Sequence, residues 1–426
     1  MAEAYLNRII QSGGAEINGV STISGTYQET IAKNDPVYSV AIAATSGVPN
    51  WNTSITDVAA PTIKPGPSTI GVSFSLNDTH MAISHDNTPY ITIYSKSGDT
   101  FTKLANPDIL PPELGNGNAF SADGTYLAVG HNLTPYITIY KRSGDVFTKL
   151  ANPSILPTGT GHGPEWSPDG VYLTVSHDTT PYITIYKRSG DTFTKLANPS
   201  SLPTGTARGV AWSPDGAYMT VGYGASPYFM TYKRAGDVFT KLADPSTIPG
   251  NTIYDAQWSS DGLYLGVASQ TTPYMIIYKR SGDTLTKLAN PSILPTGDTR
   301  GIDFTENANY VVLGMTVTPY LHIYSRAGDV FTQETNPSTL PTSYAQSAAF
   351  SKDGAYIVIP HNGATDYVSI YKTTLAVGTS AYNQINKSSN LLSEASITDV
   401  NALGYANTAG VLNDELTDIT KIWGLA

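Results

Sequence analysis

The feature that most restricts the fold is a repeat of 46 residues. An aromatic residue recurs seven times at this interval, at Phe74, Phe120, Trp166, Trp212, Trp258, Phe304 and Phe350. A Pro-Tyr pair follows in the same frame in six copies, from Pro89-Tyr90 to Pro319-Tyr320, and the seventh copy carries a displaced Asp366-Tyr367. A fixed period in this range indicates a chain assembled from copies of one supersecondary unit.

Each copy contains four strand patterns separated by turn residues. In the third copy the strands are predicted at residues 164–167, 172–176, 182–187 and 192–196, with turns at Pro168-Asp169-Gly170 and Ser189-Gly190-Asp191. The third strand is bulky on both faces, which suits a sheet packed between two neighbours. Pro and Gly at every strand boundary exclude helical repeats. Four antiparallel strands repeated seven times predict an all-β, seven-bladed β-propeller.

The seventh copy lacks a fourth strand after Lys372. Shifting the first linker, residues 100–111, back by one period places it on residues 54–65, where Pro61, Ile63 and Pro65 match. We therefore predict that residues 54–58 supply the missing strand and close the ring, which covers its free edge. Residues 396–400 repeat Ser-Ile-Thr-Asp-Val and rank second, because no matching proline pattern follows them.

The propeller is expected over residues 51–372, which leaves two flanks. A ring closed by one strand from each end brings the flanks out close together, and neither is long enough to bury a good core alone. We predict that residues 1–50 and 373–426 are the two halves of one β-rich module, with the propeller inserted between them. Strands are expected at 20–23 and 37–43, apolar pieces at 403–406 and 419–423, and a short helix at 2–11.

Composition excludes several functional classes. The chain has 24 Lys and Arg, 34 Asp and Glu, and a net charge of −10, which argues against a nucleic-acid-binding surface. It has no apolar run of membrane-spanning length, so no membrane span is expected. It has no cysteine, which excludes disulfides, a thiol nucleophile and Cys-ligated metals. The acid at Glu3 and the absence of an apolar core argue against a signal peptide.

Short stretches resemble structural proteins of tailed bacteriophages. Met-Ala-Glu-Ala-Tyr-Leu-Asn-Arg-Ile-Ile followed by Gly-Gly resembles the start of such proteins. Residues 31–38 and 402–406 resemble strands of small phage β-modules, although Asn34 stands where the pattern has Gly. The repeats, with Trp-Ser-Pro-Asp-Gly and Tyr-Ile-Thr-Ile-Tyr-Lys-Arg, resemble the WD40-like propellers of phage tail or head-surface proteins.

The resemblance implies a virion component, assembled in the host cytoplasm without a signal peptide. It implies contacts with other virion proteins, for which the module of residues 1–50 and 373–426 is the candidate, with a homo-oligomer expected. It transfers no site residue.

Two columns of polar residues are given structural interpretations. His85, His131, His177 and His361 recur once per blade, which spreads them round a ring rather than converging them on a metal. We interpret them as hydrogen-bonded rim histidines and predict no metal site. A column of arginines stands three residues before the Gly-Asp aspartates, which predicts weak local ion pairs. Its members are Arg142, Arg188, Arg234, Arg280 and Arg326.

Acid–base chemistry has few candidates. Glu165, Gln257 and Asp303 interrupt a small-residue column on the innermost strand, and a solvated channel lining is the expected role. Two carboxylates from different blades could act in catalysis only if the channel brought them together. There is no Gly-x-Ser-x-Gly elbow and no phosphate loop. We therefore predict no catalytic residue and no cofactor.

One column varies where the rest of the repeat does not. It lies just before the first strand, on the face that carries the longer connections, and in seven blades it reads Ile70, Asn116, His162, Arg208, Tyr254, Arg300 and Gln346. Diverse side chains on a repeated scaffold are typical of a binding face. Asn116, His162, Arg208, Tyr254, Arg300 and Gln346 are the predicted ligand-binding residues. Neutral drift at a solvated rim is the competing interpretation.

Three functional classes follow. The first is a structural and interaction protein of a phage particle, displaying the propeller as a decoration, fibre or adhesin that binds a host-surface glycan or protein. The second is a propeller-scaffold enzyme acting on polysaccharide, and the third is a soluble interaction scaffold. Propellers host all of these, so the fold alone does not decide between them.

Overall fold

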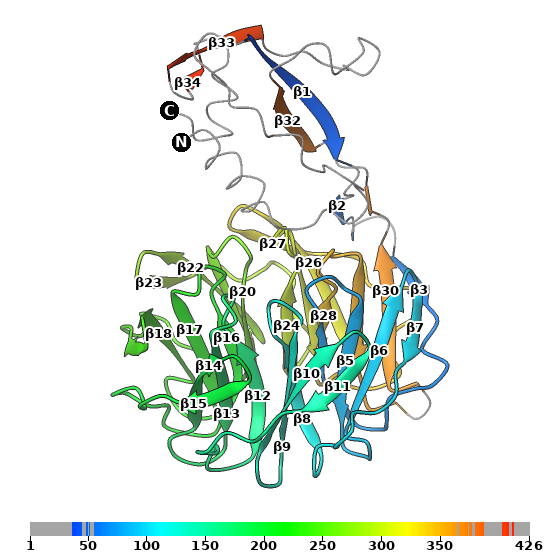
Figure 1. Ribbon diagram of the computed structural model, residues 1–426, viewed down its shortest axis with the longest axis vertical. Helices are drawn as coiled ribbons and strands as arrows, with labels where there is room; N and C mark the ends of the chain where they lie inside the picture. Colours follow the sequence, from blue (N-terminus) through cyan, green and yellow to red (C-terminus); the bar gives the residue numbers. More distant parts are fainter. Residues whose placement is uncertain are drawn as a thin grey trace. The chain divides into compact units, whose positions relative to one another are not determined.

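The computed structural model describes residues 36–44, 48–49, 51, 55–363, 366–373, 375–376, 380–386, 403–408 and 411–412. The chain divides into two compact units, Met1–Pro49 with Leu375–Ala426, and Asn50–Thr374. The regular elements of the described residues are all strands (Figure 1). No helix capable of crossing a membrane occurs in this part of the chain.

In the first unit, β1 (Pro36–Ala44) pairs antiparallel with β32 (Ser380–Asn386) and β33 (Leu403–Thr408). β33 also pairs with β34 (Val411–Leu412), and β2 (Val48–Pro49) pairs with β31 (Leu375–Ala376). The strand expected at 37–43 coincides with β1. The elements expected at 2–11, 20–23, 396–400 and 419–423 lie outside the described residues. An attachment role for this unit stays a prediction.

The second unit is the predicted seven-bladed propeller, in which the described strands form seven four-stranded antiparallel sheets. Blades one to three, each given from its innermost strand outwards, are β4 (Thr69–Phe74), β5 (His80–His85), β6 (Ile91–Ser97), β7 (Thr100–Lys103); β8 (Gly115–Phe120), β9 (Tyr126–His131), β10 (Ile137–Ser143), β11 (Val146–Lys149); and β12 (Gly161–Trp166), β13 (Tyr172–His177), β14 (Ile183–Ser189), β15 (Thr192–Lys195). Blades four to six are β16 (Ala207–Trp212), β17 (Tyr218–Tyr223), β18 (Phe229–Ala235), β19 (Val238–Lys241); β20 (Ile253–Trp258), β21 (Tyr264–Ser269), β22 (Met275–Ser281), β23 (Thr284–Lys287); and β24 (Thr299–Phe304), β25 (Tyr310–Met315), β26 (Leu321–Ala327), β27 (Val330–Gln333).

The ring closes as predicted. The last blade contains β28 (Ala349–Phe350), β29 (Tyr356–Pro360) and β30 (Val368–Thr373), and its outer strand is β3 (Ile55–Val58) from the other end of the unit. β3 and β30 run side by side in Figure 1, with Ile55 opposite Thr373 and Val58 opposite Ile370. The indole of Trp51 donates a hydrogen bond to the carbonyl of Gly354, 3.1 Å away. Both ends of the propeller unit therefore lie at the face of the short turns.

Local sequence explains the strand boundaries. The turn at 168–170 forms because Gly170 adopts a φ of 64°, and the Asp169 carboxylate accepts a hydrogen bond from the Val171 amide at 3.0 Å. The first strand of this blade begins at Gly161, earlier than predicted, because a register shift between Gly161 and Pro164 lets the strand continue past an irregular pair. This extension brings the variable column into the innermost strand.

The hydrophobic core lies between the blades. Seven clusters of buried residues form in the described part of the unit, and each joins two adjacent blades. Between blades three and four, Tyr172 stacks on Trp212 at 6.1 Å, and Phe239 meets both rings edge-on. The predicted sandwiching of each sheet between neighbours is confirmed.

The predicted local ion pairs of the arginine column are wrong. The Arg234 guanidinium instead donates to Asp169 of the preceding blade at 2.7 Å, passing 4.9 Å from the ring of Tyr172. The Gly-Asp aspartate Asp237 pairs with Lys187 of the preceding blade at 2.8 Å. Side chains stand roughly perpendicular to their sheet, so they reach the next blade rather than their own hairpin. These ion pairs therefore connect neighbouring blades.

Candidate functional site

The innermost strands surround a central channel of about 760 Å³, a size that suits a small ligand. Its lining begins with the variable column at one end, and the short turns, including exposed Lys352, lie at the other. The six predicted binding residues all line this channel and are half-buried. We call the end that they form the mouth; its members are Asn116, His162, Arg208, Tyr254, Arg300 and Gln346.

Tyr254 lies beside two arginines from the neighbouring blades. The Arg208 guanidinium is 5.2 Å from the centroid of its ring, and that of Arg300 is 3.8 Å away. Cations from both neighbouring blades therefore lie against the ring of Tyr254, an arrangement that fixes the guanidinium groups in place. Arg300 is also ion-paired with Asp298 at 2.8 Å, so a carboxylate already neutralises its charge.

Arg208 and His162 retain unused hydrogen-bonding capacity. Nε of Arg208 and Nε2 of His162 are buried without a hydrogen-bond partner among the described residues. Burial, together with the nearby Arg208 cation, lowers the pKa of His162 to about 4, so its imidazole is neutral at physiological pH. Asn116 by contrast is held by Asn132 at 2.6 Å and by the carbonyl of Gly161 at 3.0 Å.

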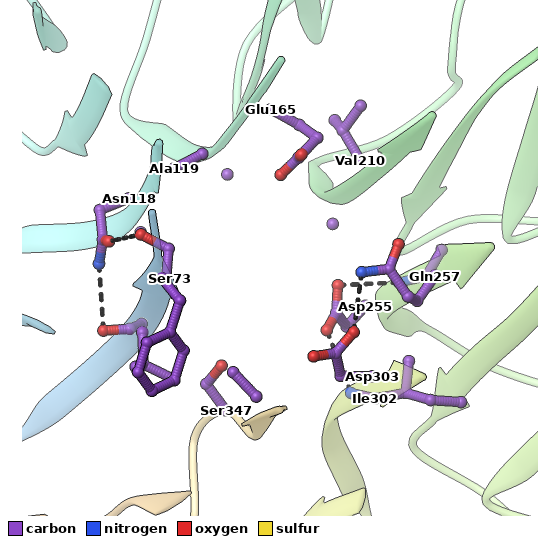
Figure 2. Close-up of a pocket in the computed structure, with 18 of the residues that line it drawn as sticks. Ser73, Asn118, Ala119, Glu165, Val210, Asp255, Gln257, Ile302, Asp303 and Ser347 are labelled. Atoms are coloured by element: carbon purple, nitrogen blue, oxygen red, sulfur yellow. Dashed lines mark hydrogen bonds between the residues drawn. The ribbon is translucent and has the colours of Figure 1, made fainter. Parts of the chain in front are cut away.

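Deeper in the channel, three carboxyl groups project into the lumen, from Glu165, Asp255 and Asp303 (Figure 2). Asp255 accepts hydrogen bonds from the amides of Ala256 at 2.9 Å and Ile302 at 3.1 Å. Asp303 accepts one from the Gln257 side chain at 3.1 Å, and another from a backbone amide of the last blade. These bonds hold the two aspartates in fixed positions.

The pKa values of these carboxyl groups differ from those of a freely solvated channel lining, although the side chains are only half-buried. Burial raises the pKa of Glu165 to about 8, and the nearby Asp255 and Asp303 add to this rise. Burial likewise raises the pKa of Asp255 to about 7 and shifts the pKa of Asp303 upwards. Loss of water around the buried part of each group destabilises its charged form more than the water in the lumen stabilises it. Glu165 is therefore mainly protonated at neutral pH.

Sequence reasoning did not single out Asp255. It stands in a column that is glycine in five of the other blades, at Gly71, Gly117, Gly163, Gly209 and Gly301. The signal that could have found it is this departure from glycine, directly beside the variable Tyr254.

The histidine column lies away from the channel. His85, His131 and His177 are fully buried and hydrogen-bond to Thr92, Thr138 and Thr184 at 2.9–3.1 Å, and His361 is bonded to Ser369 in the same way. They are hydrogen-bonded, as interpreted, but they lie in blade interiors rather than at a rim. No group of three or more His, Asp or Glu residues in the described parts of the chain is arranged to hold a metal ion.

The chain matches no known family model, and no curated protein matches it significantly. The likeness to phage virion proteins therefore stays a resemblance of short motifs, and the β-propeller fold is what the structure establishes.

Proposed function

We propose that the propeller is a binding module whose mouth recognises a glycan. The observation that carries the proposal is the position of Arg208, which lies against Tyr254 and whose side chain has no hydrogen-bonding partner among the described residues. Around it lie a neutral imidazole, a tyrosine and side-chain amides that can donate to or accept from hydroxyl groups. The six residues of the mouth are all polar or amphipathic, which favours a hydroxyl-rich ligand over an apolar peptide side chain.

The proposed setting is the surface of a phage particle. The motifs of the flanks and repeats support it, as does the geometry of the propeller unit. Its two ends lie at the short-turn face, so the mouth opens on the face without chain ends. In this proposal the unit containing β1 and β32 contacts other virion proteins, and the protein is a homo-oligomer. Weak binding at each mouth is then strengthened by many copies on one particle.

The proposed place in a phage particle can be tested separately from glycan binding. The gene should lie among capsid and tail genes, and the protein should be found by mass spectrometry in purified particles. Light scattering of the purified chain should give a mass above that of one copy.

The binding proposal is tested on a glycan array and on host cells. Full-length protein should bind a subset of glycans, and a variant carrying Arg208→Ala, Tyr254→Ala and Arg300→Ala should lose that binding. A Lys187→Ala variant, altered on the outside of the ring, is the control for folding and nonspecific charge. Equal binding by the wild type and the triple variant, or binding by neither, would favour a purely structural coat component.

A second candidate rests on the interior of the channel. Protonated Glu165 faces the same lumen as Asp255 and Asp303, and an acid paired with a carboxylate base is what polysaccharide-cleaving enzymes use. This enzyme would release reducing ends from a polysaccharide bound in the channel. A Glu165→Gln variant should then bind normally and release none. Absence of product from the wild type on every polysaccharide that it binds would remove this candidate.

A further inference from the structure

We infer that the ligand recognised at the mouth carries a carboxylate, supplied by an acidic sugar, and that this carboxylate binds the guanidinium of Arg208. The inference rests on the proposed glycan-binding function and adds the chemical class of the ligand. It follows from a comparison of the arginines, from the neighbours of Arg208, and from the charge of the channel below it.

Arg208 is exceptional among the arginines of the described residues. The other six each donate a hydrogen bond or form an ion pair within the protein; they are Arg142, Arg188, Arg234, Arg280, Arg300 and Arg326. The side chain of Arg208 forms neither with the described residues. Its guanidinium lies over the ring of Tyr254 instead. Nε of Arg208 is buried without an acceptor among the described residues, so this donor has left water without a replacement and the site is incomplete.

A carboxylate completes that site better than a neutral hydroxyl group does. The planar guanidinium presents parallel N–H donors that match the two oxygens of a carboxylate. Tyr254 stacking holds the guanidinium in place, and the backbone of Arg208 is held by a hydrogen bond from the Ser176 hydroxyl to its carbonyl. A prepositioned partner reduces the entropy lost on binding. Nearby, Nε2 of His162 and the hydroxyl of Tyr254 can bond the sugar hydroxyls.

The rest of the channel limits the ligand to one or a few negative charges. The second mouth cation, Arg300, is already paired with Asp298. Glu165, Asp255 and Asp303 line the interior, and burial raises the pKa of Glu165 to about 8 and that of Asp255 to about 7. Glu165 is therefore mainly uncharged at neutral pH and Asp255 is about half ionised, so the interior offers no positive counter-charge to a polyanion entering the lumen. In the described lining, positive charge lies at the mouth and at Lys352, at the opposite end of the channel.

The experiment titrates full-length protein with matched small probes, followed by NMR. The probes are methyl β-D-glucuronide, methyl β-D-glucoside, a methyl sialoside, and a short peptide ending in a free carboxylate. At least one acidic sugar should bind about tenfold or more tightly than the neutral glucoside, as expected for a charge-assisted pair of hydrogen bonds. Arg208→Ala should remove this preference, so that the acidic sugar binds no more tightly than the neutral glucoside. Arg208→Lys should restore little of it, because an ammonium lacks the guanidinium fork.

Lys352→Ala is the matched control, since it removes one positive charge at the opposite end of the same channel. It should leave the preference for acidic sugars intact. Equal affinity for acidic and neutral sugars would overturn the inference while leaving the proposed glycan binding in place. Tighter binding of the peptide than of any sugar would also overturn it, and binding of no sugar at all would refute the proposed function itself.

Discussion

Replacing Glu165 with glutamine should change how the stability of the propeller depends on pH. In the folded chain, burial raises the pKa of Glu165 from its usual 4.5 to about 8. The folded state therefore holds this proton more tightly than the unfolded state does. Stability from this group is fully present below about pH 4.5, falls as the pH rises, and levels off above about pH 8.

The size of the effect follows from the same shift. A rise in pKa from 4.5 to about 8 corresponds to about 5 kcal/mol, at about 1.4 kcal/mol per pH unit. Because the side chain is half-buried and meets water in the lumen, we expect roughly half of this, about 2–3 kcal/mol. Glutamine fills a similar volume and carries no charge, so the Glu165→Gln variant should not lose this part of its stability at high pH.

Urea denaturation of both proteins, at pH values from about 5 to about 9, measures the effect. The free energy of unfolding of Glu165→Gln, relative to the wild type, should increase across this range. Asp255 and Asp303 remain in both proteins and add the same background. Glu113→Gln is the control, because Glu113 is exposed and lies in the connection between β7 and β8. Parallel curves for the wild type and Glu165→Gln would refute the reasoning, because Glu165 would then be fully solvated.

Three further predictions concern the ring. Phe193→Ala removes a ring whose centroid lies 6.2 Å from that of Tyr126 and 5.7 Å from that of Trp166. Urea denaturation should show a free energy of unfolding lower by about 3–5 kcal/mol. A loss below about 1 kcal/mol would contradict the packing of this core between the blades. Lys187→Ala breaks the exposed ion pair with Asp237 and should change the free energy of unfolding by less than about 1 kcal/mol. A larger loss would show that the ion pairs between blades act as a network. Deleting residues 51–58 removes β3, so hydrogen exchange should quicken in β30 and remain slow in β18; unchanged exchange in β30 would mean that β3 does not close the ring.

The sequence was sufficient for the plan of the propeller. The period of 46 residues determined the number of blades, and the proline pattern after residue 58 identified the closing strand. Both are local signals, because a turn or a linker depends on residues close together in the chain. The position of the variable column at the channel mouth also followed from strand order alone.

The contacts between blades could not be predicted in the same way. Arg234 and Asp169 are 65 residues apart, and their ion pair depends on the distance and angle between two neighbouring sheets. The same holds for Tyr254, whose two guanidinium neighbours come from the blades on either side. Repetition shows that these residues occupy equivalent places in their blades, but the side-chain directions appear only in the closed ring.

The raised pKa values of the channel carboxyl groups could not be predicted from the sequence either. Glu165 and Asp303 interrupt a column of small residues and could be singled out, whereas Asp255 replaces a glycine in a different column and was not. The influence of Asp255 on Glu165 requires two blades to face one lumen. That proximity is a property of ring closure rather than of any single repeat.

Hydrogen exchange of the full-length chain tests directly whether a glycan binds at the mouth. It is measured with and without the glycan that binds most tightly on the array. The account predicts slower exchange in the segments leading into β12, β16, β20 and β24, the four strands that carry His162, Arg208, Tyr254 and Arg300. It also predicts that Arg208→Ala abolishes this protection. Protection confined to the outer strands, to the short-turn face or to the flanking unit would contradict it.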